Sequence, residues 1–70
     1  PTGRDVIDRF ITEAPQYLRP YGRVLLVQSS LSNVEATLNR FHKKGLEARI
    51  LAEQKAMFET ITIVEAQRRN

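Results

Sequence analysis

The stretch LRPYGRVLLVQSSLSNVE, residues 18–35, decides how the chain folds. It holds a turn around Pro20 and Gly22, an unbroken apolar run at residues 24–27, and Ser32 ahead of a helical pattern. Because apolar and polar residues do not alternate in the run, it is typical of a central strand covered on both faces. The stretch therefore predicts a layered α/β domain with a strand over Arg23–Ser29 and a helix after it.

The turn before this strand is predicted to be type I. Pro20 stands at the second position of Arg19-Pro20-Tyr21-Gly22, where proline suits both common turn types. A type II turn would need a positive φ at Tyr21, which is unfavourable for a bulky side chain.

One helix is predicted before this strand in the chain and another after it. Residues 6–18 carry an apolar stripe at helical spacing, with Thr2 and Asp5 as a capping box at the start and a kink at Pro15. The second helix begins at the cap residue Ser32 and ends at Lys43-Lys44-Gly45, where cations and a glycine form a standard stop.

Two further strands are predicted at residues 46–53 and 58–65, joined by a short hairpin. In the first of them, alternation places Leu46, Ala48, Ile50 and Ala52 on one face. The final residues, Arg68-Arg69-Asn70, are predicted to be a frayed tail. The order is therefore α-β-α-β-β, with the last strand antiparallel.

These elements do not make a complete layered domain. Three strands and two helices cannot cover both faces of the apolar strand and fill both edges of its sheet, and the first helix follows no strand. At 70 residues, the chain is also close to the lower size limit for a self-sufficient core. The chain begins at Pro1 without an initiator methionine. We therefore expect residues 1–70 to be one partial domain, the C-terminal half of a larger α/β domain.

Three segments of the sequence resemble a known protein family. GRDVIDRF, LRPYGRVLLVQSSL and ETITIVE are similar to the region after the NPPY motif in HemK-type, class I S-adenosylmethionine-dependent methyltransferases. The nearest branch is the archaeal and eukaryotic one that methylates glutamine in release factors, and the resemblance covers residues 3–66. It implies a Rossmann-like sheet whose last strand inserts antiparallel between its two predecessors. Tyr21 departs from the pattern, because the family usually has glycine there.

The resemblance also implies an activity for the parent protein. The parent would use S-adenosylmethionine to methylate a glutamine side chain in a protein such as a release factor, in the cytoplasm. The glycine-rich cofactor loop, the ribose-binding acidic residue and the NPPY motif of the family do not occur in this chain. We therefore assign it no catalytic, cofactor-binding or metal-ligating residue. Alone it is expected to be structural and inactive, with its own N-terminal half as partner.

Three polar residues are candidates for the substrate cleft. Gln28, Ser29 and Ser30 stand at the carboxyl end of the apolar strand, where open parallel sheets place their ligands. In the resembling enzymes this edge borders the substrate channel. The alternative interpretation is that Ser29 and Ser30 only form the turn into the Ser32 cap.

Other polar residues favour structural roles. Asp5 and Asp8 could form a carboxylate pair for acid–base chemistry, but the spacing of Asp5 and Arg9 favours a cap and a solvated charge near Arg4 and Arg9. His42 has no second histidine or cysteine with which to bind a metal, and histidine is common at helix ends.

The amino-acid composition excludes several kinds of site and function. The absence of cysteine excludes disulfides and cysteine-ligated zinc and fits a reducing compartment, and no apolar run is long enough to span a membrane. A net charge of +3 permits nucleic-acid contact, but Tyr17, Tyr21 and Phe58 are too dispersed for a base-stacking platform. Nucleic-acid binding is therefore not expected.

Two alternatives to the methyltransferase interpretation stay open. One is a self-standing basic α/β module that binds RNA or a regulatory ligand. The other is an oligomerisation domain that self-associates through an exposed sheet edge. A binding module is expected to be folded and monomeric, whereas a half-domain is expected to be unfolded, molten or self-associated.

Overall fold

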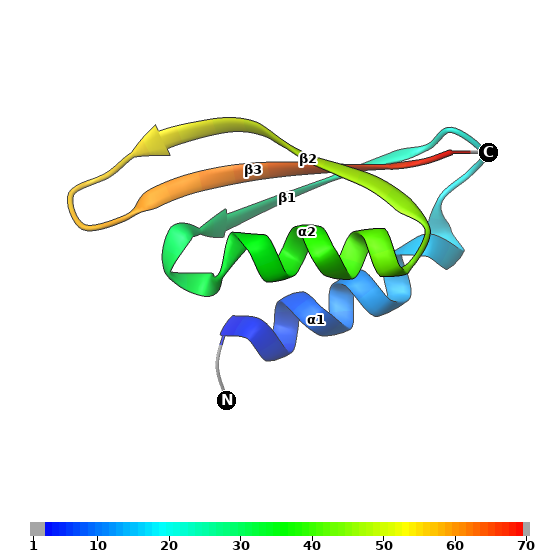
Figure 1. The fold of residues 1–70 in the computed structure, drawn as a ribbon, viewed down its shortest axis with the longest axis horizontal. Helices are drawn as coiled ribbons and strands as arrows, with labels where there is room; N and C mark the ends of the chain where they lie inside the picture. The colour runs from blue at the N-terminus through cyan, green and yellow to red at the C-terminus, as the bar shows by residue number, and fades with distance from the viewer. Residues whose placement is uncertain (1–2, 70) are drawn as a thin grey trace.

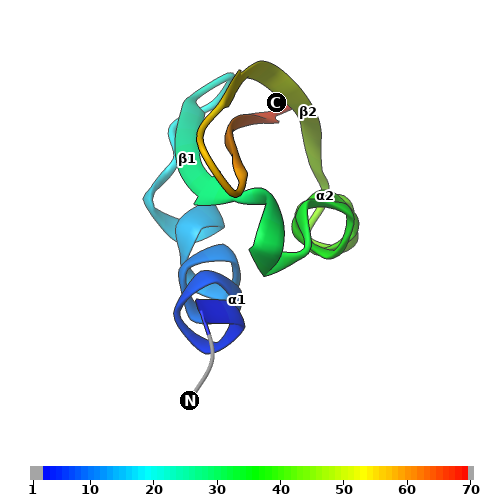
Figure 2. The ribbon, with the colours of Figure 1, turned by 90° about the vertical axis from the view of Figure 1, so that its left-hand side faces the viewer.

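In the computed structural model, which describes residues 3–69, two helices cover one face of a three-stranded sheet (Figure 1, Figure 2). The order of elements confirms the α/β fold class predicted from the sequence. The elements are α1 (Gly3–Glu13), a 3-10 turn (Ala14–Tyr17), β1 (Arg23–Ser29), a second 3-10 turn (Ser30–Ser32), α2 (Val34–Lys43), β2 (Leu46–Lys55) and β3 (Thr60–Arg68).

The last strand lies in the middle of the sheet. The strand order is β1-β3-β2, and β3 is antiparallel to both neighbours, so Val64 faces Leu26 on one side and Ile50 on the other. Because both outer strands oppose β3, β1 and β2 run in the same direction. This is the predicted arrangement, in which the final strand inserts antiparallel between its predecessors.

A bulge at Leu51 interrupts the ladder between β2 and β3. Ile50 pairs with Val64, but the next pair joins Ala52 to Ile63, so Leu51 has no partner residue in the register. Val64 is completely buried toward the helices, whereas its neighbour Ile63 points to the opposite face. The prediction that Ala52 shares a face with Ile50 is therefore wrong, because the extra residue reverses the alternation.

The core lies between the sheet and its two helices. Its buried residues come from both helices and from β2 and β3: Ile7, Ile11, Phe41, Leu46, Val64 and Ala66. Phe41 is fully buried, and a side chain of this kind contributes about 1.5–3 kcal/mol relative to an exposed one. The apolar stripe of α1 is only partly used, since Val6 remains 73% exposed.

The opposite face of the sheet has no covering layer among residues 3–69, as Figure 2 shows. On β1, Leu25 and Val27 point to this bare face and are 57% and 62% exposed. The strand is also an edge strand, paired only with β3 in the described part of the chain. The second layer and the second neighbour predicted for this strand are therefore not supplied by the described residues.

The turn before β1 differs from its prediction. Tyr21 has φ 61°, and the Gly22 amide donates to the Arg19 carbonyl over 2.7 Å. A proline followed by a residue with positive φ is the type II pattern, so the predicted type I turn is wrong. Hydrogen bonds from Arg68 hold this turn: its amide donates to the Gly22 carbonyl (2.9 Å) and its guanidinium to the Leu18 carbonyl (2.6 Å).

The same contacts correct the predicted frayed tail. Arg68 is the last residue of β3, and Arg69 forms an ion pair with Glu47 at 3.1 Å. The prediction is therefore wrong for these two residues, because backbone pairing and the arginine contacts anchor them; Asn70 lies outside the described residues.

The helix ends follow the sequence signals with one shift. Asn33, rather than Ser32, caps α2, since its Oδ1 accepts from the Ala36 amide over 3.0 Å. The predicted kink is confirmed, because α1 gives way to the 3-10 turn that contains Pro15. The predicted stop after α2 is confirmed too, with Gly45 at φ 83°. The predicted capping role of Thr2 lies outside the described residues.

Candidate functional site

The candidate site is the edge of the sheet where β1 and β2 end (Figure 1). Since these two strands run in the same direction, their carboxyl ends share one edge, and ligands of open α/β sheets bind at such edges. Gln28, Ser29 and Ser30 lie there together, as their positions in the sequence predict. Their individual contacts decide what each can do.

Gln28 is a buried residue whose amide oxygen and amide nitrogen are both hydrogen-bonded. Its side chain is on the helix face of β1, and the residue is only 6% exposed. Its Oε1 accepts from the Thr37 hydroxyl over 2.6 Å, and its Nε2 donates to the Ser32 carbonyl over 3.2 Å. Gln28 therefore fixes the start of α2 against the end of β1, rather than facing solvent.

Thr37 and Arg4 complete this polar network. Thr37 is fully buried, and its hydroxyl accepts from Arg4 Nη1 over 2.6 Å while it donates to Gln28. The Arg4 guanidinium also donates to the carbonyls of Ser32 and Asn33 over 2.9 and 3.0 Å. One cluster of polar side chains thereby joins α1, α2 and the end of β1. Neither role is predicted from the sequence, since Thr37 carries only the weak signal of a polar residue beside an apolar stripe.

Ser29 and Ser30 both act as hydrogen-bond acceptors at the candidate edge. Ser29 Oγ accepts from the Leu31 amide over 3.1 Å, which supports the short turn that follows β1. Ser30 Oγ accepts from the Thr60 amide over 3.0 Å and so joins the end of β1 to the start of β3. The Ser29 contact matches the turn-forming alternative, whereas the Ser30 contact links β1 to β3 instead. Each hydroxyl can still donate its hydrogen to a ligand at this edge.

The remaining predicted polar residues have structural contacts. Asp8 forms ion pairs with Arg4 at 2.6 Å and with Arg40 at 3.0 Å, so its carboxylate links α1 to α2. His42 Nε2 lies 3.4 Å from the Ala48 carbonyl. No group of three His, Cys, Asp or Glu among residues 3–69 could hold a metal ion. We therefore assign neither residue to acid–base or metal chemistry.

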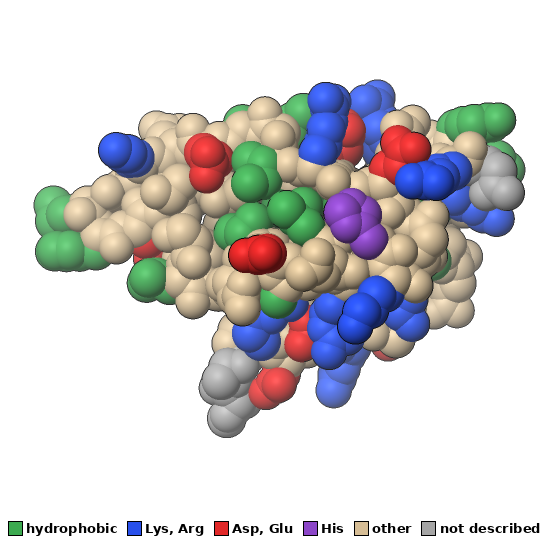
Figure 3. All heavy atoms as spheres, viewed as in Figure 1, with side chains coloured by type: hydrophobic (Ala, Val, Ile, Leu, Met, Phe, Trp, Pro, Cys, Tyr) green, Lys and Arg blue, Asp and Glu red, His purple; other side chains and the backbone are tan. Residues whose placement is uncertain are grey.

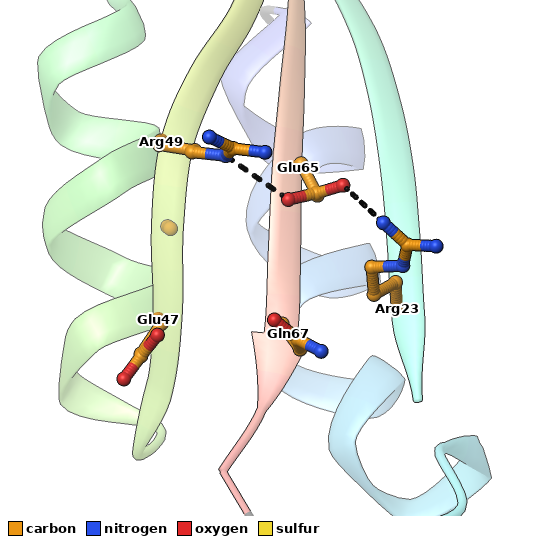
Figure 4. A pocket seen from close by; sticks show the side chains of 6 residues that line it. Arg23, Glu47, Arg49, Glu65 and Gln67 are labelled. Carbon is orange, nitrogen blue, oxygen red and sulfur yellow. Dashed lines mark hydrogen bonds and ion pairs between the residues drawn. The ribbon is translucent and has the colours of Figure 1, made fainter. Parts of the chain in front are cut away.

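A charged depression lies on the bare face of the sheet (Figure 4). At its centre, the Glu65 side chain, 8% exposed, lies between Arg23 and Arg49, at 3.2 and 3.1 Å. Each arginine comes from a different neighbour of β3, so the carboxylate ties all three strands together. Because the central carboxylate already neutralises part of their charge, the arginines form a cross-strand clamp rather than an anion site.

Gly22 and Gly45 do not form a cradle for S-adenosylmethionine. Gly22 is enclosed by the Arg19 backbone, where an added Cβ would meet an oxygen at 2.8 Å, and Gly45 ends α2. Neither belongs to a glycine-rich loop between a strand and a helix, which is what a nucleotide-like cofactor requires. We therefore assign no cofactor contact to these residues.

No helix in the described range is long and apolar enough to cross a membrane.

Comparisons with known proteins agree with this architecture. No protein family model matches the chain. A Methanocaldococcus jannaschii protein named as a protein N5-glutamine methyltransferase is 39% identical over 66 residues, which are 94% of this chain and 34% of that protein. A chain in the solved structure of the E. cuniculi Mtq2-Trm112 complex, described as responsible for methylation of the eRF1 translation termination factor, matches with a TM-score of 0.79. That match has 29% identity and covers 94% of this chain and 37% of the other.

Both comparisons confirm the resemblance to HemK-type glutamine methyltransferases and the fold predicted with it. The chain spans about a third of the length of each relative, from 34% to 37%.

Proposed function

We propose that this chain forms the C-terminal part of an S-adenosylmethionine-dependent methyltransferase that methylates a glutamine side chain in a protein. The strand order carries the proposal, since β3 lies antiparallel between two strands of common direction. The similarity to a glutamine methyltransferase over 94% of the chain supports the same conclusion.

The parent enzyme would transfer a methyl group from S-adenosylmethionine to the amide nitrogen of glutamine. The name of the archaeal relative specifies glutamine, and the solved E. cuniculi complex is described as methylating a translation termination factor. We therefore propose a release factor as the protein substrate and the cytoplasm as the location.

The bare face and the free edge of β1 are proposed to be covered by the N-terminal half of the same methyltransferase domain. Leu25 and Val27 would be buried there, and a further strand would pair with the outer edge of β1. Burying about 100 Å² of apolar surface stabilises by about 2.5 kcal/mol, so joining the halves favours folding of both. The cofactor loop and the catalytic residues would lie in that N-terminal half, so residues 1–70 alone would be inactive.

At the candidate edge, the three polar residues would form one wall of the substrate cleft. Ser29 and Ser30 would present their hydroxyl groups to the substrate, whereas Gln28 would shape the wall from behind through its bonds to Thr37 and Ser32. None of them is proposed as a nucleophile, because neither serine has a histidine or lysine beside it in the described structure.

The test is a two-dimensional amide NMR spectrum of the labelled 70-residue chain, recorded before and after addition of S-adenosylmethionine. It shows whether this part of the domain folds and binds the cofactor without the N-terminal half. We expect broad, poorly dispersed peaks that the cofactor does not move. Adding the N-terminal half should sharpen and disperse them and should restore methylation of a release factor. Sharp peaks from the chain alone, with no response to the N-terminal half, would contradict the proposal.

The alternative of a self-standing RNA-binding module gains no support from the charge distribution. Arg4 and Arg40 are paired with Asp8, and Arg23 and Arg49 are paired with Glu65. Cations that are neutralised within the protein contribute little to phosphate binding. Self-association through the bare face is the outcome we propose for the chain when its N-terminal half is missing.

A further inference from the structure

The tip of the β2–β3 hairpin exposes two adjacent apolar side chains. Met57 and Phe58 are each 86% exposed, in the loop of residues 56–59 beyond the last strand pair, Lys55 with Thr60. Figure 3 shows apolar side chains at the end of the molecule where Figure 1 places this hairpin. A single exposed apolar residue is common on protein surfaces, but an adjacent pair at a projecting tip suits contact with another molecule.

The tip is held in place by hydrogen bonds at both of its ends. The Ala56 amide donates to the Glu59 carbonyl over 2.7 Å and closes the loop. The Thr60 amide donates to Ser30 Oγ over 3.0 Å and fixes the hairpin to the end of β1. The two apolar side chains are therefore presented on a supported turn, and ordering them on binding costs little backbone entropy.

The tip also lies at the edge where a substrate is expected. Both β1 and β2 end there, and the candidate cleft residue Ser30 contacts the base of the hairpin directly. Leu31, immediately after Ser30, is 75% exposed and adds a third apolar side chain to the same edge. The hairpin tip is thus joined to the proposed cleft through the contact between Thr60 and Ser30.

We infer that Met57 and Phe58 anchor the protein substrate whose glutamine is methylated, an inference that rests on the proposed function. Aromatic side chains are frequent energetic anchors in protein interfaces, and methionine adapts its shape to varied apolar partners. The charges beside the tip, Lys55 against Glu53 and Glu59, give no basic surplus. A partner with an apolar recess therefore fits this tip, and a nucleic acid does not.

The test uses the complete methyltransferase and the double variant Met57→Ser, Phe58→Ser. We expect KM for the release factor to rise about tenfold or more, the loss typical of removing an interface anchor. The kcat at saturating substrate, the dissociation constant for S-adenosylmethionine and the melting temperature should stay at their native values. The matched control is Tyr17→Ser: Tyr17 is 78% exposed but lies in the 3-10 turn at the other end of the molecule, so KM should not change.

Other results would overturn the inference in distinguishable ways. An unchanged KM in an active double variant would show that the substrate does not contact the tip. A lower melting temperature or weaker cofactor binding would show that the N-terminal half covers the tip instead. Competition by RNA that the double variant abolishes would show a nucleic-acid site. If the native enzyme binds S-adenosylmethionine but methylates no glutamine, the proposed function fails, and the anchor for such a substrate fails with it.

Discussion

Replacing Thr37 by valine is expected to uncouple the two helices from the carboxyl end of β1. Valine has nearly the same shape as threonine, so the main effect of the change is loss of the hydroxyl group and its hydrogen bonds. It leaves the buried Oε1 of Gln28 without its 2.6 Å donor and removes one acceptor from Arg4. Arg4 keeps its bonds to the Ser32 and Asn33 carbonyls, so most of the cost arises at Gln28.

The magnitude follows from these two losses. A buried polar group left without a partner costs about 1–3 kcal/mol, and the lost bond from a charged donor adds roughly 1 kcal/mol once its other acceptors are counted. We therefore expect Thr37→Val to lower the free energy of unfolding by about 2–4 kcal/mol, a large part of the stability of a small domain.

Urea unfolding of the complete methyltransferase, followed by circular dichroism, measures this difference, with Thr37→Ser as the matched control. Serine keeps the hydroxyl and loses only a methyl group, so its cost should be about 1 kcal/mol. The side-chain amide signals of Gln28 should shift in the valine variant and stay near their native positions in the serine variant. A valine variant as stable as the native protein, with unmoved Gln28 signals, would refute the role given to this network.

Three further substitutions test other parts of the fold by the same unfolding measurement. Tyr21→Gly should stabilise the protein by about 1 kcal/mol, because Tyr21 has φ 61° and glycine adopts this conformation without strain. Destabilisation by this change would argue against the type II turn. Thr62→Val should also stabilise, by about 1 kcal/mol, since Thr62 Oγ1 is buried without a partner among residues 3–69; a loss of stability would reveal a missed hydrogen bond. Glu65→Gln should destabilise by about 1 kcal/mol, because Arg23 and Arg49 lose the charge they share, and this difference should shrink in high salt. A difference that does not respond to salt would show that Glu65 acts through packing alone.

Local signals in the sequence predicted the succession of the strands along the chain and their directions, whereas the central position of β3 was implied by the family resemblance. The apolar run at residues 24–27, the glycine stop at Gly45 and the short loop before β3 leave few topologies open. The interpretation of Gln28, Ser29 and Ser30 also had a topological basis, since residues that end parallel strands meet at one edge.

The errors arose where distant residues override a local preference. Tyr21 adopts a positive φ because hydrogen bonds from Arg68, at the far end of the chain, hold the turn. The contact between Arg4 and Thr37 spans 33 positions and leaves no pattern in a single sequence. The bulge at Leu51 is equally invisible, because alternation continues through it in the sequence while the pairing in space does not.

The bulge at Leu51 affects the direction of the β2–β3 hairpin but not the side chains at its tip. Deleting Leu51 would leave Ile50 opposite Val64 and Ala52 opposite Ile63, so every pair beyond it would survive. What would change is the local bend and the extra twist that a bulged strand introduces. The presence of one extra residue in β2 therefore sets the direction of the hairpin tip, whatever residues the tip contains. Losing the extra residue would therefore redirect the hairpin while every side chain at its tip stayed the same.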